Sequence, residues 1–467
     1  MSAAVASDLA ELSKQPGNAG SSDPGTGQIK ITLKTRDESV SVPDVPLFVP
    51  LSLKRYGLSE VVNHLLDTEK PIPFDFLING ELLRVSLFDY ITSKGLSSES
   101  TIELEYTRSI LPPTFLASYS HPDWVSSVDI LKSMPVAKAP IVSGCYDGIV
   151  RTWSLAGQVT SEFAGHTAPV KSVKFFENGK KIVSGSMDRS IRIWKVPDES
   201  ATTNDEDDTD ETIAAVGSAR IFTGHKAAVN SVAADSSTSR VLSAGADCIV
   251  GLWNTNYKQA PPATVTVSTR EPTGKRRRKS ALPSRGPISL MESHTEPVTG
   301  VIFDAKDSTV GYSVSLDHTI KTWDLVTSAL VDTRTTSFSL LSIAHLPRLS
   351  LLCCGSSARH VTLHDPRAAA DETTTRTLHG HTNFVVSIAP SPESDYMFST
   401  ASHDGTVRVW DVRANRSLYV IDRDTRTADV KTKVFGVDWS HEVGIVSAGE
   451  DKRVQVNRGT DLDTVKA

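Results

Sequence analysis

Serine, histidine, aspartate and tryptophan recur together along the chain at fixed spacings. Five tryptophans each follow an aspartate by six residues, and a serine or threonine stands four residues before that aspartate. The five sets are Ser143, Asp147 and Trp153; Ser184, Asp188 and Trp194; Ser243, Asp247 and Trp253; Ser313, Asp317 and Trp323; and Thr400, Asp404 and Trp410. In four sets a histidine precedes the aspartate by 22 or 23 residues: His166, His225, His294 and His381. Serine, histidine and aspartate could form a catalytic triad, in which the histidine takes the proton of the serine hydroxyl.

The repetition favours a structural role instead. Catalysis needs one such set, whereas a protein built from copies of one unit needs a polar network in every copy. The aspartate can accept a hydrogen bond from the imidazole, the imidazole can bond to the hydroxyl, and the hydroxyl can meet the indole N–H, so that each buried polar group has a partner. No Gly-rich phosphate loop, metal cluster or isolated pair of nucleophile and base is visible in the sequence. We therefore predict a non-enzymatic scaffold with no cofactor or metal of its own.

The four cysteines add no further chemistry. Cys145, Cys248, Cys353 and Cys354 form no C-x-x-C motif and no Cys/His cluster with the spacing of a zinc site. We expect them to be small buried thiols in a reducing, intracellular compartment.

The residues before each tryptophan predict the elements that position these networks. Strings such as "IVRTW", "IRIW" and "VRVW" alternate apolar and polar residues, which is typical of β-strands. The coupled spacing resembles the WD40 repeat, in which each unit is one four-stranded blade of a propeller. Two further units are degenerate, one with Cys354, Ala358 and His364 at the Ser, Asp and Trp positions and one with Ser447, Asp451 and Asn457. The sequence therefore predicts a seven-bladed WD40 β-propeller over residues 109–467.

The two ends of the predicted ring are unusual. His121 lies 26 residues before Asp147, farther than in the other sets, and only ten residues follow Asn457. Ten residues are too few for a full outer strand in the last blade, and an open ring would leave unpaired strand edges. We therefore expect the segment 114–119 to supply that strand and close the ring.

Two long insertions interrupt the repeat, in the third and fourth blades. The first is a loop predicted over 198–216, with the acidic tract "DESATTNDEDDTDE", which we interpret as solvated charge. The second, predicted over 258–288, carries five consecutive basic residues: Lys275, Arg276, Arg277, Arg278 and Lys279. Such a run can be bound by an import receptor or can contact RNA phosphates. We favour nuclear localisation, with direct rRNA contact and plain solvated charge as the alternatives.

Residues 28–108 follow a different pattern, that of a small mixed domain. Apolar residues alternate in "QIKITLKT" and again at Val40 and Val42, which indicates strands. The string "GLSEVVNHLLD" has helical spacing with Ser59 as the expected N-cap, and Asn79-Gly80 marks a hairpin turn. A short helix around 86–91 and the strand "TIELEY" follow, with no diglycine tail. The predicted fold class is an all-β seven-bladed WD40 β-propeller preceded by a small α+β ubiquitin-like domain.

The composition of the whole chain fits this architecture. Its 467 residues are 39% hydrophobic and carry a net charge of −6, which gives no global reason to expect nucleic-acid binding. No apolar run of about 18 residues is present, so we expect no membrane partner. Residues 1–27 lack the apolar stretch of a signal peptide and are predicted to be a disordered leader.

Several strings resemble the WD-repeat subunit of the PeBoW (Pescadillo, Bop, WD-repeat) complex of ribosome biogenesis. Among them are "LSLKRYGLSEVVNHLL", "PFDFLINGELLR", "GYSVSLDHTIKTWDLVT" and "LLCCGSSARHVTLHDPR", within residues 28–456. The resemblance implies a factor in maturation of the large (60S) ribosomal subunit and its rRNA, located in the nucleolus and nucleoplasm. It also implies that the propeller binds the propeller of the Bop-type subunit on the pre-60S particle, and Pescadillo through it. The sequence assigns no face of the propeller to that partner.

The same resemblance implies a role for the ubiquitin-like domain. In this family it docks on the metal-ion-dependent adhesion site of Midasin, an AAA ATPase that releases the complex from the pre-60S particle. A glutamate in the loop before the last strand completes the coordination of the partner's Mg²⁺, an ion that favours oxygen ligands. The matching string runs from Gly95 to Ser100, so Glu99 is the predicted ligand in trans, with Glu81 and Asp89 as the alternatives.

A ubiquitin-pathway substrate adaptor is the alternative function. It would bind ligases or the proteasome, whereas a ribosome biogenesis factor would purify with pre-ribosomal RNA.

Overall fold

The computed structural model describes residues 27–67, 71–96, 101–109, 112–132, 140–197, 219–257, 259–263, 284–368, 376–423 and 432–459. The chain divides into two compact units between residues 109 and 110. We call the first unit the head and the second the propeller, and each has hydrophobic clusters of its own.

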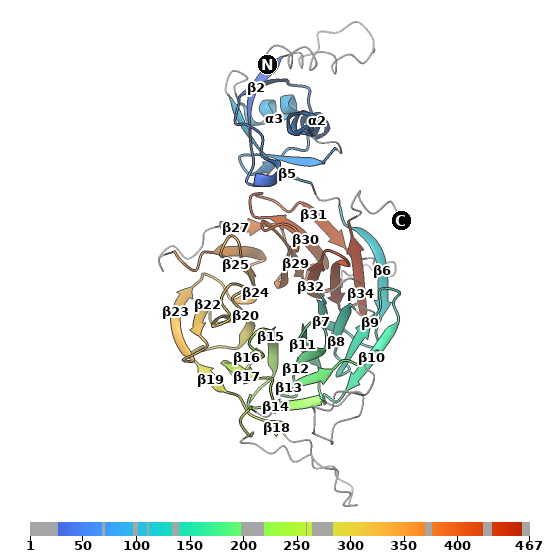
Figure 1. Ribbon diagram of the computed structural model, residues 1–467, viewed down its shortest axis with the longest axis vertical. Coiled ribbons are helices and arrows are strands. Elements are labelled where there is room, and N and C mark those ends of the chain that lie inside the picture. The colour runs from blue at the N-terminus through green and yellow to red at the C-terminus, as the bar shows by residue number, and fades with distance from the viewer. Residues whose placement is uncertain are drawn as a thin grey trace, which may run out of the picture. The chain divides into compact units, whose positions relative to one another are not determined.

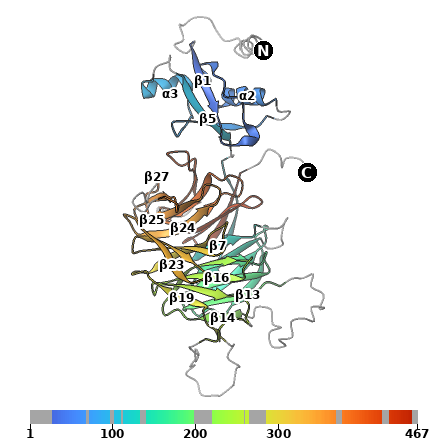
Figure 2. The same ribbon diagram turned by 60° about the vertical axis from the view of Figure 1, so that its left-hand side comes forward.

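The head is a five-stranded mixed sheet with two helices. Its elements are β1 (Gln28–Lys34), a 3-10 helix (Glu38–Val40), β2 (Leu47–Pro50), α2 (Arg55–Leu66), β3 (Phe74–Ile78), β4 (Glu81–Leu82), α3 (Leu87–Lys94) and β5 (Ile102–Arg108). The strand order is β2-β1-β5-β3-β4, with β1 and β5 parallel at the centre (Figure 2). Leu58 of α2 and Leu87 of α3 both pack into one cluster with Ile31 and Phe76 of the sheet. The expected ubiquitin-like fold is confirmed.

Two local predictions for the head are wrong. Val40 and Val42 are buried but form no strand, because the Tyr106 hydroxyl donates to the Val40 carbonyl (2.7 Å) and accepts from the Val42 N–H (3.0 Å). The Tyr106 hydroxyl of β5 thus satisfies the two main-chain groups that a neighbouring strand would otherwise have bonded. Ser59 is not an N-cap, since α2 begins at Arg55 and the Ser59 hydroxyl instead accepts from the backbone N–H of Phe74 (3.1 Å).

The propeller consists of seven sheets arranged in a ring (Figure 1), which confirms the predicted fold. From the inner to the outer strand, blades 1 to 3 are β7 (Val125–Ile130), β8 (Ile141–Cys145), β9 (Ile149–Trp153) and β10 (Val159–Ala164); β11 (Val170–Phe176), β12 (Lys181–Ser186), β13 (Ser190–Lys195) and β14 (Ala219–Thr223); and β15 (Val229–Asp235), β16 (Arg240–Gly245), β17 (Ile249–Asn254) and β19 (Ser289–Glu292). Blades 4 and 5 are β20 (Val298–Phe303), β21 (Val310–Ser315), β22 (Thr319–Asp324) and β23 (Ala329–Thr335); and β24 (Leu340–Leu346), β25 (Leu351–Ser356), β26 (His360–His364) and β27 (Arg376–His379). Blades 6 and 7 are β28 (Val385–Pro390), β29 (Met397–Ser402), β30 (Thr406–Asp411) and β31 (Tyr419–Asp422); and β32 (Val434–Ser440), β33 (Gly444–Gly449), β34 (Arg453–Arg458) and β6 (Thr114–Ser120).

Polar side chains of the inner strands join each blade to the next. Thr299 of blade 4, for example, donates from Oγ1 to the carbonyl of Leu340 in blade 5 (2.9 Å). The other six joints are Ser126 to Val170, Ser172 to Val232, Asn230 to Val298, Ser342 to Val385, Ser387 to Val437, and Asp438 to Ile130. Because each of these bonds satisfies a main-chain group of the adjacent strand, they fix the blades in register around the ring.

The ring closes through the segment 114–119, as expected. Strand β6 pairs antiparallel with β34, from Arg453↔Ser120 to Arg458↔Thr114, and so supplies the outer strand of blade 7 (Figure 1). The Tyr119 ring at its end stacks on Trp153 of blade 1, with 5.6 Å between ring centroids. The first strand of the propeller therefore ties the last blade to the first.

Both insertions lie one blade earlier than the repeat numbering placed them. The acidic tract falls between β13 and β14 of blade 2, and the basic run falls between β17 and β19 of blade 3. In each of these two blades, the outer strand follows the insertion in sequence and pairs with the strand that precedes the insertion. The insertion therefore belongs to the blade before the one to which the repeat numbering assigned it. The second predicted loop contains a strand, β18 (Ser284–Arg285), which pairs parallel with β14 of the neighbouring blade.

Candidate functional sites

The predicted polar network is complete in four blades. In blade 2, Trp194 Nε1 donates to Ser184 Oγ (2.8 Å), and Ser184 Oγ lies 2.7 Å from His166 Nε2. His166 Nδ1 lies 2.8 Å from Asp188 Oδ2. The same contacts join His225, Ser243, Asp247 and Trp253; His294, Ser313, Asp317 and Trp323; and His381, Thr400, Asp404 and Trp410.

Burial and hydrogen bonds set the protonation states of the network in blade 2. Burial lowers the pKa of His166, so the imidazole is neutral and donates its Nδ1–H to Asp188. Burial alone would raise the pKa of Asp188, but hydrogen bonds from His166 and Ser190 outweigh it and hold the pKa below its usual value. These contacts match those of a catalytic triad, yet Ser184 is fully buried and its oxygen also accepts from the indole. Since no substrate can reach the hydroxyl, the set stabilises the blade.

Blade 1 keeps three of the four members in contact. His121 Nε2 and Trp153 Nε1 each lie 2.8 Å from Ser143 Oγ. His121 Nδ1 meets the Tyr119 carbonyl (3.3 Å) instead of a carboxylate, and Asp147 pairs with Arg151 (2.8 Å). Burial lowers the pKa of His121 to about 4. The longer spacing from His121 to Asp147 thus accompanies the loss of the hydrogen bond between the imidazole and the carboxylate.

Blade 7 replaces the histidine with an arginine that sequence analysis missed. Arg423 donates from Nε and Nη2 to the Asp451 carboxylate (2.8 and 2.9 Å) and from Nη1 to Ser447 Oγ (3.0 Å). It therefore bridges the same two positions that a histidine bridges elsewhere. Its spacing of 28 residues from Asp451 gave no signal, because the pattern required a histidine 22 or 23 residues away.

Blade 5 has lost the network. Cys354 occupies the hydroxyl position, fully buried, and burial raises the pKa of its thiol. His364, at the tryptophan position, bonds through Nε2 to the neighbouring Thr362 Oγ1 (2.8 Å). Local bonds of another kind occur in this blade, such as those from Ser356 Oγ to the His360 carbonyl (2.9 Å) and from Thr362 Oγ1 to the Cys354 carbonyl (3.4 Å).

Residues 97–100 of the loop predicted to carry the metal ligand of the head, Glu99 among them, lie outside the described residues. Its flanks are described: α3 ends at Lys94, Gly95 is its C-cap in a left-handed conformation (φ 63°), and β5 begins at Ile102. Both alternative residues already have partners, since Glu81 pairs with Lys94 (2.8 Å) and Asp89 accepts from the hydroxyl of Ser86, the N-cap of α3 (2.6 Å). Each of these carboxylates thus has a structural role.

Residues Lys275 to Lys279 and the acidic tract also lie outside the described residues. Among the residues that the structure does describe, no group of three or more His, Cys, Asp or Glu side chains is placed to hold a metal ion. No helix in the same part of the chain is both long and apolar enough to cross a membrane.

Comparisons with known domain families match both units. The family described as "NLE (NUC135) domain" matches residues 29–91 of the head. The family described as "WD domain, G-beta repeat" matches residues 113–154, 157–195, 217–254, 285–324 and 372–411. The intervals left unmatched contain the two degenerate units, in which Trp is replaced by His364 or Asn457.

Full-length relatives share both units in the same order. Ribosome biogenesis protein YTM1 of Vanderwaltozyma polyspora is 50% identical over 456 residues, which cover 95% of this chain and 99% of the relative. The proteins of the same name from Candida albicans and Saccharomyces cerevisiae (strain S288c) are also 50% identical, and each alignment covers 93% of this chain and 98% of the relative. A chain this similar over nearly its whole length, with a head and seven WD40 blades, belongs to the YTM1 family of ribosome biogenesis proteins.

Proposed function

We propose that this chain is a scaffold in maturation of the large ribosomal subunit, with the propeller as an anchor and the head as the site on which an ATPase pulls. The observation that supports this division most strongly is that each unit has a core of its own. A head with its own core can be pulled by one partner while the propeller stays bound to another. The relatives are named for ribosome biogenesis. The Ser-His-Asp sets of the propeller are buried in structural networks, which supports a scaffold over an enzyme.

The propeller binds the Bop-type WD-repeat subunit, and Pescadillo through it, on the pre-60S particle. A closed ring suits this role because every joint between blades is bonded, so the surface loops are held on a rigid frame. A rigid frame also transmits force from the head to the particle.

The head docks on the adhesion site of Midasin through Glu99. A Mg²⁺ at such a site has open coordination positions that one carboxylate from another protein can complete. The contacts of the two alternatives favour Glu99, since Glu81 and Asp89 each already bond to a side chain within the head. The Mg²⁺ belongs to the partner, and this chain supplies one oxygen ligand.

The basic run Lys275 to Lys279 acts as the nuclear import signal and brings the protein to the nucleolus and nucleoplasm. Direct contact with rRNA phosphates is the second role that five adjacent cations support.

Purification of the tagged full-length chain tests this function. We expect the Bop-type subunit, Pescadillo and precursor rRNA of the large subunit to purify with it. Recovery of ubiquitin ligases or proteasome subunits without precursor rRNA would instead support the adaptor function.

A further inference from the structure

Blade 2 carries a fifth strand that comes from the insertion of blade 3. Strand β18 pairs parallel with β14, the outer strand of blade 2, with Phe222 opposite Arg285 (Figure 1). The Gly286 N–H donates to the Pro261 carbonyl (2.8 Å), and Pro262 forms a β-bridge with Arg285. The two ends of the segment that contains the basic run are therefore held together at the outer edge of blade 2.

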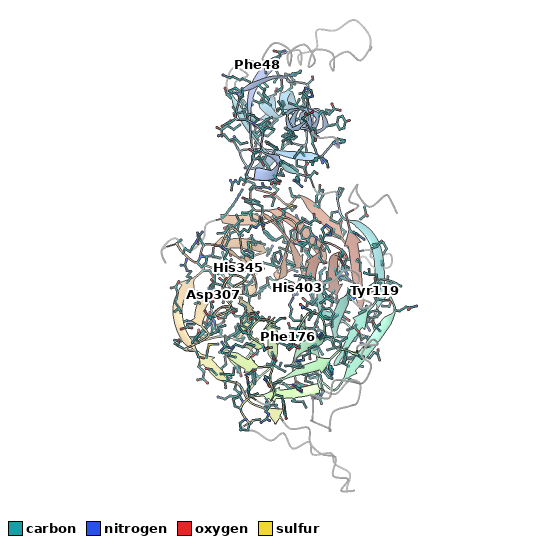
Figure 3. All side chains as sticks on the ribbon, in the orientation of Figure 1. Phe48, Tyr119, Phe176, Asp307, His345 and His403 are labelled. Carbon is teal, nitrogen blue, oxygen red and sulfur yellow. The ribbon has the colours of Figure 1, made fainter. Side chains whose placement is uncertain are left out.

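Two arginines from these strands lie over one tyrosine ring. Tyr257 follows β17, and its ring centroid is 4.2 Å from the Arg285 guanidinium and 5.5 Å from that of Arg220 on β14. Phe222, two residues along β14, packs into the hydrophobic cluster between blades 2 and 3 with Phe176, which Figure 3 labels. Residues two apart on a strand share a face, so Arg220 also faces blade 3. We call Arg220, Tyr257 and Arg285 the arginine–tyrosine stack.

The two guanidinium groups have no hydrogen-bond partner among the residues that the structure describes. Neither Arg220 nor Arg285 forms a side-chain hydrogen bond or an ion pair within this set, and Arg285 Nε is buried without an acceptor. Arg376 is the equivalent of Arg220 in blade 5, since each pairs with the residue before the Trp position of its blade. Arg376 donates to the carbonyls of Val412 and Arg413 in the next blade. The next blade can thus satisfy an arginine at this position, but blade 3 supplies a ring instead.

This arrangement favours an anionic ligand. Attraction to the ring holds each guanidinium in place without supplying oxygen acceptors for its N–H groups. Two positive charges beside one ring repel each other, and an anion that bonds to both would relieve that repulsion. The planar fork of arginine matches the oxygens of phosphate. The arginine–tyrosine stack therefore has the charge and the donors of a phosphate site.

The surroundings of the stack favour the phosphates of RNA over a single phosphate ion. The basic run Lys275 to Lys279 lies between Ala263 and Ser284, and the Ala263 N–H donates to the Ser284 carbonyl (3.4 Å). The segment with the run thus leaves and rejoins the fold beside Arg285. RNA binds where several cations are in excess, and bases of single-stranded RNA also stack on guanidinium planes.

We propose that the arginine–tyrosine stack binds backbone phosphates of a single-stranded RNA segment of the pre-60S particle. Arg220 and Arg285 contact the phosphates, and Tyr257 is a positioning residue that holds both guanidinium groups. This assignment rests on the proposed function, because it takes the particle as the source of the RNA. It gives direct contact with rRNA a site separate from the basic run.

Fluorescence anisotropy of the full-length chain with a labelled single-stranded RNA of about ten nucleotides tests the proposal. Affinity is measured over a range of salt concentrations, because each neutralised phosphate contributes about 0.7 to the slope of log K against log salt. Arg220→Gln combined with Arg285→Gln should reduce this slope by about 1.4 in magnitude. It should also weaken binding about ten-fold at low salt. The same losses should occur when Lys275 to Lys279 are alanine, because the stack is a separate site.

The matched control is Arg348→Gln combined with Arg367→Gln. It makes the same change in net charge, but these exposed arginines pair with Asp395 (3.0 Å) and Asp365 (3.0 Å). The control should keep the salt slope and an affinity within about twofold of the wild type. Unfolding temperatures are measured for each variant. If the double variant of the stack unfolds at a lower temperature, Arg220→Gln alone decides, with an expected slope change of about 0.7.

The outcomes separate the site from the function. A wild-type slope in the stack variant, or an equal loss in the control, would overturn the stack as an RNA site. Displacement of the RNA by inorganic phosphate at matched ionic strength would overturn RNA in favour of a free phosphate ion. Both results leave the proposed function to the purification of precursor rRNA with the tagged chain. If no precursor rRNA is recovered but the oligonucleotide still binds through the two arginines, the proposed function fails and the site stands.

Discussion

Each complete network in the propeller places a histidine between a hydroxyl and a carboxylate, all three buried beside a tryptophan. Ser184 donates to one imidazole nitrogen of His166, and the other nitrogen donates to Asp188. Removing one member leaves the others without partners in a medium where an unpaired polar group costs about 1–3 kcal/mol. The repeat is therefore specified residue by residue, and departures from it have measurable consequences.

His121 should make the propeller sensitive to acid. Its pKa is about 4 in the folded protein and about 6.5 in an unfolded chain. The unfolded chain therefore binds more protons between these values, so the stabilisation is complete above about pH 6.5 and is lost as the pH falls toward 4. We expect the free energy of unfolding in denaturant to fall by about 2 kcal/mol through this residue between about pH 7.5 and pH 5.

The comparison variant is His121→Gln, which should reduce the pH dependence by that amount even if it is less stable at neutral pH. His441→Gln is the control, because His441 is exposed. An unchanged pH dependence in His121→Gln would remove His121 from the acid response.

Arg423 should be as important to blade 7 as the histidines are to their blades. Arg423→Met leaves Asp451 and Ser447 facing an apolar side chain, and breaking a buried pair in this way costs about 3 kcal/mol or more. Arg367→Met removes a similar two-pronged contact, to Asp365, but at the surface, where solvent screens the pair and the loss of stability should be small. Chemical denaturation of both variants measures the difference, and equal losses would contradict the assigned role of Arg423.

At the scale of elements, the sequence pattern predicted those strands, turns and helices that neighbouring residues determine. The strand before each tryptophan, the Asn79-Gly80 turn and the two helices of the head follow from periodicity and turn chemistry, and Asn79 and Gly80 indeed have positive φ values of 50° and 78°. The failures depend on contacts distant in sequence. Val40 is held by Tyr106, and β18 pairs with a strand of another blade. No window of neighbouring residues contains either partner.

Closure by β6 should stabilise the whole ring rather than one blade. Tyr119 on this strand is buried against Trp153, and replacing a buried aromatic with alanine costs about 3–5 kcal/mol. Thermal unfolding of Tyr119→Ala should therefore occur as a single transition at a lower temperature. Phe115→Ala, on the same strand but exposed, should unfold like the wild type. A separate transition at lower temperature in Tyr119→Ala, with the main transition at the wild-type temperature, would show that β6 detaches without weakening the ring.

For the whole molecule, we propose that the basic insertion directs localisation and that the two units bind different partners. Replacing Lys275 to Lys279 with alanine should lower nuclear accumulation of a tagged chain, because an import receptor would lose its cationic contacts. The flanking pairs of β17 with β19 and β14 with β18 do not use these residues, so the unfolding temperature should not change. Fusion of an unrelated import signal is the control and should restore accumulation. Unaltered localisation of the alanine variant would leave the run without this role.

We propose that the head offers one carboxylate to a metal ion held by the ATPase, and the function of the head depends on this contact. The direct test measures binding of the full-length chain, already in complex with the Bop-type subunit, to the isolated adhesion domain of Midasin in the presence of Mg²⁺. Glu99→Ala should abolish this binding and leave the subunit attached, and a chelator should abolish binding of the wild type equally. Glu81→Ala, which removes the pair with Lys94, should bind like the wild type. Binding by Glu99→Ala that equals the wild type and survives the chelator would contradict the account.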